Sequence, residues 1–340
     1  MKRIIVIFLF LLLLSNGCLK QQIVGFNIVE KADICLDIHS PVFREPIEML
    51  KNKNYFFIAD FRGDSLLWIY DVSKQSLLRK DAPRGIEINE FQPPIEIACV
   101  DSILMIHNRW HHSARTFLVN GIDCAFVNNG RLDSLPIRID RLYPITNKLY
   151  IASGRFEEGR YALLDEQGDI IQFFGDFPSY QMGEQHMSNL PKFLFHQTTF
   201  TYNQQQRLLA SITGHVLDIM DCSQNPPVKT NRVLLSKYRY SYFESNGYTS
   251  VRMKKNTELG AIFSCSTDKY IYIVYDPTTK KTFSSDKIVN SEVWVFDWSG
   301  KPIRKIVLDY QITCLSVDNE DAIAYCILKA PKPVLAYFNL

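Results

Sequence analysis

The sequence predicts an all-β protein, a six-bladed β-propeller built from four-stranded antiparallel blades. Helical periodicity is almost absent after the N-terminal leader, and short apolar runs alternate with polar turns. Several of these runs end at an aspartate that opens a tight turn. These turns recur at intervals near 45 residues, which is the length of one propeller blade. A chain of 340 residues can form a single body of this kind.

Two of the turns are complete enough to assign their geometry. They read Asp165-Glu166-Gln167-Gly168 and Asp297-Trp298-Ser299-Gly300. An aspartate at the first position accepts a hydrogen bond from the backbone two residues on, and the glycine adopts the left-handed conformation that a bulged hairpin needs. The five turns begin at 71, 120, 165, 221 and 297, with spacings of 49, 45, 56 and 76 residues. The widest spacing predicts an insertion in one blade.

The last repeat is one strand short. It begins at Ile312, and its final apolar run, Val334 to Asn339, lies at the end of the sequence. We expect the N-terminal part of the mature chain to supply the missing outer strand, from either Ile23 to Val29 or Cys35 to Ile38. A ring closed by both ends of the chain has no long exposed sheet edge. A pair of β-sandwiches, the alternative all-β fold, would not produce six near-equal repeats.

The first residues form a secretory leader. Lys2 and Arg3 precede an apolar run of eleven residues, Ile4 to Leu14, whereas a membrane-spanning helix needs about 20. The next residues, Leu14-Ser15-Asn16-Gly17-Cys18, resemble a bacterial lipobox. We expect residues 1–17 to be removed, Cys18 to be lipidated, and residues 18–340 to form one propeller domain. An ordinary signal peptide followed by a chance cysteine is the alternative.

Composition limits the possible partners. The chain is 46% hydrophobic and 22% charged, which excludes disorder. Its 38 Lys and Arg against 36 Asp and Glu leave no basic excess for a phosphate backbone, so no nucleic-acid partner is expected. The segment after the lipidated cysteine, Leu19-Lys20-Gln21-Gln22, lacks the acidic pair of a surface-export tag. We therefore expect an outer-membrane lipoprotein on the periplasmic side, with the cell surface as the alternative.

Seven further cysteines follow Cys18. Their number is odd, and most of them lie in apolar runs, where a free cysteine behaves as a small core residue. We expect buried thiols, and we leave open a disulfide between one pair only, Cys314 and Cys326. The seven are Cys35, Cys99, Cys124, Cys222, Cys265, Cys314 and Cys326.

The chain also resembles a known family. The lipobox, the six repeats and Ala59-Asp60 at the end of the second strand of the first blade look like the TolB-like six-bladed propeller lipoproteins of Bacteroidetes. The resemblance covers nearly the whole mature chain. It implies the propeller fold and an envelope location. It implies no catalytic activity, because members of the family mostly have none assigned.

A search for catalytic and metal-binding motifs returns none. The sequence contains no Gly-rich phosphate loop, Gly-x-Ser-x-Gly, Cys-x-x-Cys, His-Glu-x-x-His or sialidase Asp turn. We therefore lean against an enzyme and expect no cofactor. The histidines at 107, 111 and 112 have no carboxylate between them, so no metal site is predicted.

Candidate ligand-binding residues lie in the loops that meet at one end of the predicted channel. These loops join the second strand of a blade to the third, and each blade to the next. An arginine offers a planar fork to carboxylates, and an aromatic ring offers a face to sugars or peptide side chains. Solvated loop arginines and a tryptophan that only caps the channel are the alternatives. The candidates are Arg62, His107, Arg109, Trp110, Arg155 and His215.

The favoured function is that of a lipid-anchored binding or scaffolding module for a protein, peptide or glycan. The alternative is a periplasmic hydrolase or lyase acting on sugars or peptides, with His107 or His215 as the base. A third hypothesis is a structural envelope protein. A deep polar channel with a carboxylate in hydrogen-bond reach of either histidine would favour the enzyme, and a shallow aromatic face would favour the binder.

Overall fold

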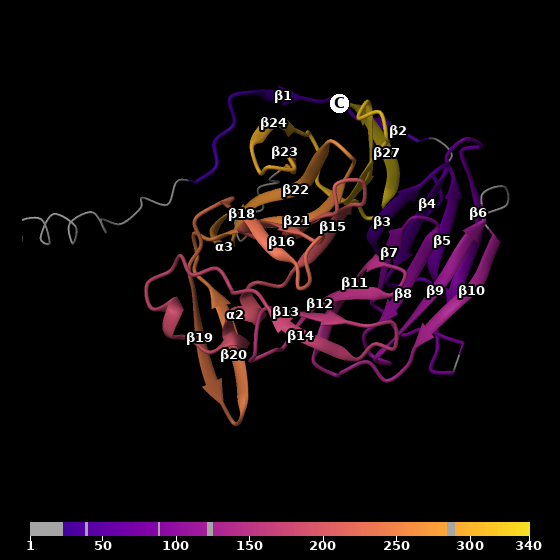
Figure 1. Ribbon diagram of the computed structural model, residues 1–340. Helices are drawn as coiled ribbons and strands as arrows, with labels where there is room; N and C mark the ends of the chain where they lie inside the picture. The colour runs from indigo at the N-terminus through magenta and orange to yellow at the C-terminus, as the bar shows by residue number, and fades with distance from the viewer. Residues whose placement is uncertain (1–22, 38–39, 88, 121–124, 284–289) are drawn as a thin grey trace, which may run out of the picture.

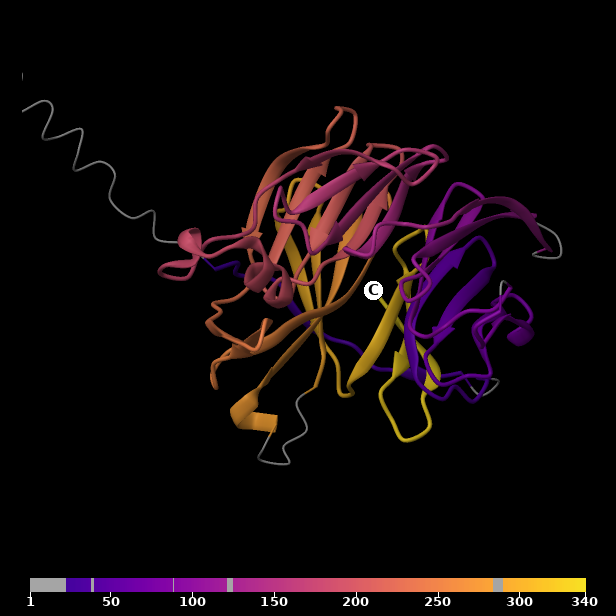
Figure 2. The same cartoon turned by 90° about the horizontal axis from the view of Figure 1, so that it is seen from below.

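The protein forms a ring of six sheets in the computed structural model, which describes residues 23–37, 40–87, 89–120, 125–283 and 290–340 (Figures 1 and 2). Each blade is antiparallel, and its strands follow chain order from the channel outwards. The inner strands pack against one another around the whole ring. The predicted six-bladed fold is confirmed. The lipobox, Cys18 and Cys124 lie outside the described residues.

The first three blades follow one another along the chain without interruption. In each of them the strand nearest the channel is the first in sequence. Their strands are β3 (Pro46–Asn52), β4 (Tyr55–Asp60), β5 (Ser65–Asp71) and β6 (Ser76–Pro83); β7 (Ile95–Val100), β8 (Ile103–Asn108), β9 (Ser113–Asn120) and β10 (Ala125–Leu132); and β11 (Ile139–Thr146), β12 (Leu149–Gly154), β13 (Tyr161–Leu164) and β14 (Ile170–Phe174).

The last three blades repeat the same arrangement, and the sixth supplies only three strands of its own. Their strands are β15 (Thr199–Asn203), β16 (Leu208–Ile212), β17 (Val216–Asp221) and β18 (Val228–Leu234); β21 (Glu258–Ser266), β22 (Tyr270–Thr279), β23 (Glu292–Asp297) and β24 (Pro302–Val307); and β25 (Ile312–Val317), β26 (Ile323–Leu328) and β27 (Val334–Asn339).

The aspartate turns have the predicted geometry. The Asp165 carboxylate accepts hydrogen bonds from the backbone N–H groups of Gln167 at 2.9 Å and Asp169 at 3.0 Å. Gly168 lies in the left-handed region, with φ of 89°, which a residue without Cβ adopts at no steric cost. Asp297 and Gly300 repeat this arrangement between β23 and β24.

Residues 23–37 form an N-terminal strap across the outside of three blades. The Val24 N–H donates to the Leu234 carbonyl beside blade 4, β1 (Val29–Lys31) runs parallel to β24 of blade 5, and β2 (Cys35–Leu36) pairs antiparallel with β27 of blade 6. Closure of blade 6 by the Cys35 segment is therefore as expected. The other predicted segment, Ile23 to Val29, does not join blade 6. The strand β1, which begins at Val29, is a fifth strand of blade 5 (Figure 1).

Two insertions interrupt the repeat. The wide spacing before the last aspartate turn contains a separate hairpin, so an insertion is present as predicted, but it lies between blades 4 and 5 and not within one blade. A second, helical insertion connects blades 3 and 4. No helix within the described residues is long and apolar enough to cross a membrane. The first insertion contains β19 (Tyr240–Ser245) and β20 (Tyr248–Met253), and the second contains η1 (Glu184–His186) and α2 (Asn189–Phe195). The short helix α3 (Lys280–Phe283) lies within blade 5, between β22 and β23.

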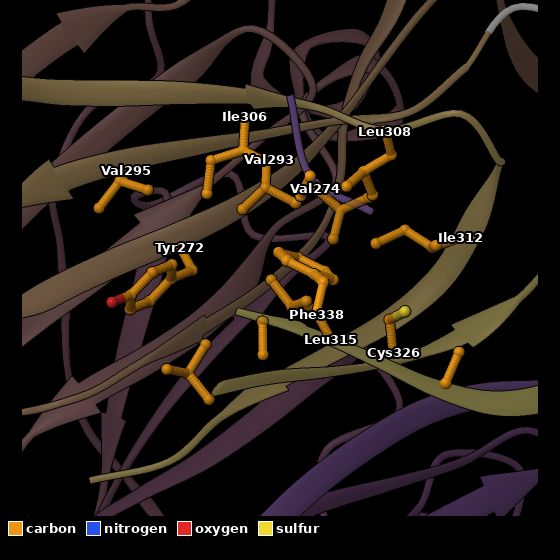
Figure 3. Packing of buried hydrophobic residues seen from close by; sticks show 14 of the residues in the cluster. Tyr272, Val274, Val293, Val295, Ile306, Leu308, Ile312, Leu315, Cys326 and Phe338 are labelled. Atoms are coloured by element: carbon orange, nitrogen blue, oxygen red, sulfur yellow. The ribbon is translucent and has the colours of Figure 1, made fainter. Parts of the chain in front are cut away.

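The core lies between neighbouring blades, because each sheet presents apolar side chains on both faces. Figure 3 shows the interface of blades 5 and 6, where Tyr272, Val293 and Leu308 of blade 5 pack against Leu315 and Phe338 of blade 6. Four of these five residues lie in strands of the two blades, and the fifth, Leu308, directly follows β24. Burial of such interfaces around the ring is the main apolar contribution to stability.

The cysteines in the described part of the chain form no disulfide with one another. Cys314 pairs across the sheet with Ile327, the neighbour of Cys326 on β26. Because successive residues of a strand point to opposite faces, Cys314 packs towards blade 1 and Cys326 packs towards blade 5. This geometry excludes the disulfide that the sequence left open. Cys35 is exposed, contrary to the expectation of a buried thiol.

We predict that Phe338→Ala lowers the free energy of unfolding by ~3 to 5 kcal/mol, because it leaves a cavity between blades 5 and 6. Urea unfolding followed by fluorescence measures the change. The matched control is Tyr337→Ala on the same strand, whose side chain faces away from this cluster and is 36% exposed, against 1% for Phe338. Equal losses in the two variants would show that this interface does not dominate stability.

Candidate functional site

The central channel contains a polar cavity of about 250 Å³ bounded by the inner strands of all six blades. Its wall combines charged side chains from blades 1 to 3 with hydroxyl groups from blades 4 and 5. Thr199 and Ser264 are 3.2 Å apart between their hydroxyl oxygens, and Thr201 and Ser266 are 2.6 Å apart. The charged residues of the wall are Glu48, Lys51, Glu96 and Arg141.

One arginine joins the first three blades inside the channel. The Arg141 Nη1 atom lies 2.6 Å from Glu48 Oε1 and 3.2 Å from Glu96 Oε1. The remaining Glu48 oxygen accepts the Ile97 N–H at 2.8 Å. The side chain of Arg141 is 31% exposed. The guanidinium is therefore fixed by two carboxylates while part of it faces the channel.

Further polar side chains lie next to this ion network but do not line the cavity. His107 Nδ1 lies 2.8 Å from Glu96 Oε2, and the histidine is buried. Arg109 forms an ion pair at 2.5 Å with Asp140, the residue that precedes Arg141 in the sequence. Glu96 lines the channel and His107 does not. We call Glu48, Glu96, His107 and Arg141 the channel network.

The two carboxylates of the network have different proton affinities. Burial raises the pKa of Glu48, and the nearby charge of Glu96 adds to the effect. Burial also opposes the charge of Glu96, but the neighbouring Arg141 and His107 outweigh it and lower the pKa of that carboxyl. Two carboxyl groups whose environments shift their pKa values apart are typical of sites that bind or transfer protons.

The positions of the network in the sequence explain how it assembles. Glu48, Glu96 and Arg141 each lie at the second or third position of an inner strand. These strands all run away from the end of the ring where the inter-blade loops lie, so their first residues meet near that mouth of the channel.

A second cavity, of about 470 Å³, lies at the same end between blades 1, 5 and 6. Arg62 lines it, as do Arg44 and Lys329, and Ile262 belongs to the walls of both cavities. Arg62 pairs with Glu45 at 2.5 Å. The buried Asp60 holds this corner, since its carboxylate accepts the N–H groups of residues 44, 45 and 62 at 2.8, 2.9 and 3.1 Å. We call this cavity the blade 6 groove.

The predicted site residues do not gather at one place. Arg62 lines the blade 6 groove, whereas His107 and Arg109 support the channel network. Trp110 is 60% exposed, with the Arg109 guanidinium carbon 6.0 Å from the centre of its ring. Arg155 is exposed and lines neither cavity. The three loop arginines therefore do not form one ring at the channel mouth.

His215 lies in a buried aromatic cluster beneath the helical insertion. Its ring stacks on Phe195 at 5.4 Å between centroids, and its Nδ1 atom is 2.9 Å from the Ser236 hydroxyl. His215 does not line the channel. Burial lowers its pKa to about 3, with a smaller contribution from the nearby His196. It is therefore neutral at physiological pH and packs as a core residue.

The same cluster contains a fully buried carboxylate, Glu184. It accepts hydrogen bonds from the Tyr238 hydroxyl at 3.0 Å and the Tyr240 hydroxyl at 2.9 Å, and its Oε1 atom lies 3.1 Å from His196 Nε2. Two backbone N–H groups, of residues 180 and 181, complete its shell at 2.9 Å each. Despite burial, these bonds lower the pKa of Glu184. The carboxylate ties the helical insertion to the base of the inserted hairpin.

Sequence reasoning missed Glu48, Glu96 and Arg141. A signal was present, because each is a charged residue at the second or third position of the first strand in three consecutive repeats. No group of three or more His, Cys, Asp or Glu residues that could hold a metal ion is found in the described parts of the chain.

Comparison with known proteins supports the fold. The family described as TolB-like 6-blade propeller-like matches residues 27–320. A Bacteroides fragilis protein, named as a candidate exported protein, shares 10% identity, with a TM-score of 0.54 over 92% of this chain and 98% of its own. A DUF4221 family member from Bacteroides vulgatus shares 10% identity, with a TM-score of 0.54 over 94% and 99%. No curated protein matches the chain.

We predict that His215 makes the protein less stable in acid. Its pKa falls from the ordinary value of 6.5 to about 3 on folding, so between these values the unfolded chain binds a proton that the folded chain does not. The free energy of unfolding is therefore unaffected by this group above pH 6.5, and it decreases as the pH falls from 6.5 towards 3. Between pH 7 and 5, the parent should lose about 2 kcal/mol more than His215→Gln. Urea unfolding at both pH values measures this difference, and identical losses would contradict the prediction.

Proposed function

The chain belongs to the TolB-like six-bladed propeller family, and we propose that it is a lipid-anchored envelope module that binds a protein, peptide or glycan at its channel mouth. The lipobox at Cys18 and the Bacteroides propellers of similar fold support an envelope location. In this proposal the anchor lies in the outer membrane, and the ring faces the periplasm.

The observation that carries the binding role is the fixed arginine of the channel network. Arg141 keeps part of its guanidinium towards the cavity while two carboxylates hold it in place. A preorganised arginine and the neighbouring carboxylate oxygens and hydroxyl groups suit a ligand with both hydrogen-bond donors and acceptors, such as a sugar or a peptide amide. A cavity of about 250 Å³ accepts one side chain or one sugar ring. The rest of such a ligand would lie along the blade 6 groove.

A hydrolase or lyase remains the second candidate, because one specific observation favours it. The channel cavity is polar, and Glu96, which lines it, lies within hydrogen-bond distance of His107. The buried position of His107 behind Glu96 does not suit a histidine that contacts substrate, and His215 lies away from the channel. In this candidate the acid and base would be Glu48 and Glu96, whose pKa values shift in opposite directions.

We predict that Glu48→Gln and Arg141→Gln each weaken ligand binding at least tenfold, because each removes one charge from the channel network. The chain from residue 18 onward, with Cys18→Ala, is applied to a panel of peptides and glycans, and bound ligands are titrated. Glu48→Gln preserves side-chain shape, and urea unfolding of each variant separates lost binding from lost folding.

The matched control is Arg155→Gln, an exposed arginine outside both cavities. It should bind as the parent does. If Arg155→Gln or the triple replacement of Arg62, Arg109 and Arg155 abolished binding while the channel variants retained it, the loop arginines would be the site and the channel would not. Cleavage of a panel member that Glu96→Gln abolishes would favour the enzyme.

We predict that labelled palmitate is incorporated into the protein in cells and that Cys18→Ala abolishes the incorporation, because the lipobox cysteine is the acceptor. Metabolic labelling followed by immunoprecipitation measures it. Cys35→Ala, which changes an exposed cysteine of the strap, is the control and should leave labelling unchanged. Labelling that persisted in Cys18→Ala would remove the anchor from the proposed function.

A further inference from the structure

The inserted hairpin of β19 and β20 projects from the ring (Figure 1). Its two strands pair only with each other. Tyr240, at the base, is buried, whereas the outer part is exposed and aromatic: Tyr242 is 41% exposed, Phe243 47% and Tyr248 78%. Phe243 and Tyr248 lie on the same face of the hairpin, because Phe243 pairs with Ser250 and Tyr248 is two residues from Ser250 on the same strand.

Basic residues surround the base of this hairpin. Residues 237–255 contain five Lys or Arg and one acidic residue, Glu244. The α3 helix adds Lys280 to the same region, since the Lys281 N–H donates to the Lys255 carbonyl at 3.4 Å. Six exposed Lys and Arg side chains of this region form no ion pair with another described residue. We call them, together with Phe243 and Tyr248, the hairpin patch; the six are Lys237, Arg239, Arg252, Lys254, Lys255 and Lys280.

The patch lies close to the point where the strap begins. Ile23 packs against the cluster that contains Tyr240, with Val251 of the hairpin beside it. Cys18 precedes Ile23 by five residues, and five residues of fully extended chain span at most ~18 Å. A lipid on Cys18 would therefore hold Ile23, which packs at the base of the hairpin, within about this distance of the bilayer.

We propose that the hairpin patch docks on an anionic phospholipid bilayer, the one that holds the anchor. Clustered lysines and arginines are attracted to lipid phosphates, and exposed aromatic rings settle at the headgroup level. The mature chain is formally neutral overall, with 36 basic and 36 acidic residues after removal of Lys2 and Arg3, so the excess of cations is local. The use of the same bilayer rests on the proposed anchor.

This docking would fix how the ring sits on the membrane. The hairpin follows the outer strand of blade 4, at the end of the ring that carries the inter-blade loops and the mouth of the channel. Glu184 and its two tyrosine partners hold the base of the hairpin rigidly. The ring would therefore lie with its binding end near the lipid headgroups.

The test measures co-sedimentation with vesicles and does not depend on the lipid anchor. The chain from residue 18 onward, with Cys18→Ala, contains every described strand. It should bind vesicles of phosphatidylglycerol and phosphatidylcholine at least tenfold more tightly than vesicles of phosphatidylcholine alone. Lys254→Glu with Lys255→Glu, and separately Phe243→Ser with Tyr248→Ser, should each weaken this binding at least tenfold.

The charge-matched control is Lys53→Glu with Lys301→Glu. Both lysines are exposed and lie in turns at the opposite end of the ring, so the control should bind as the parent does. Equal binding to both kinds of vesicle, or equal loss in the control, would overturn the proposal. Binding to polyglutamate without binding to vesicles would assign the patch to an acidic protein and overturn it as well. If palmitate labelling did not depend on Cys18, the proposed anchor would be wrong, but the vesicle-binding result would still stand, because that test uses the chain without the lipid.

Discussion

The packing of blade 6 against blade 1 holds the ring closed, and the channel depends on it. Phe43, Met49 and Phe56 of the first blade region bury their side chains against Cys314 and Ile327 of the last blade. The strand pairing that joins the two ends of the chain is much smaller, since β2 and β27 share only two residue pairs. Apolar burial therefore contributes most of the closure, and the hydrogen bonds set its register.

Closure determines the chemistry of the channel because β3 lies between the inner strands of blades 6 and 2. Glu48 is positioned on β3, and its partners Arg141 and Glu96 belong to the following blades. If the first blade separated from the last, the wall of the cavity would open at the strand that carries Glu48. Loss of one partner from this partly buried ion network would leave the remaining charges unpaired, which is destabilising. The network and the ring thus support each other.

Local patterns in the sequence sufficed to predict the blades but not the site. The aspartate turns at Asp165 and Asp297 are local chemistry, so they could be recognised from four residues each. The channel network is assembled from residues 48, 96 and 141, and their meeting depends on the register of three sheets around a common axis. The parallel pairing of β1 with β24 was equally hidden, because few side-chain features distinguish an outer strand of one blade from that of the next.

The strap has a mechanical consequence. It crosses the outer edges of blades 4, 5 and 6 and contacts no inner strand through its sheet pairing. A pull on the N-terminus would first load the Val24 to Leu234 hydrogen bond, then the short β1 pairing, and only then β2. Tension would peel the strap away from the outside, one attachment after another, while the four strands of each of the first five blades keep their own pairings. A force on the N-terminus would therefore detach the strap before it disturbed the strand pairings within the first five blades.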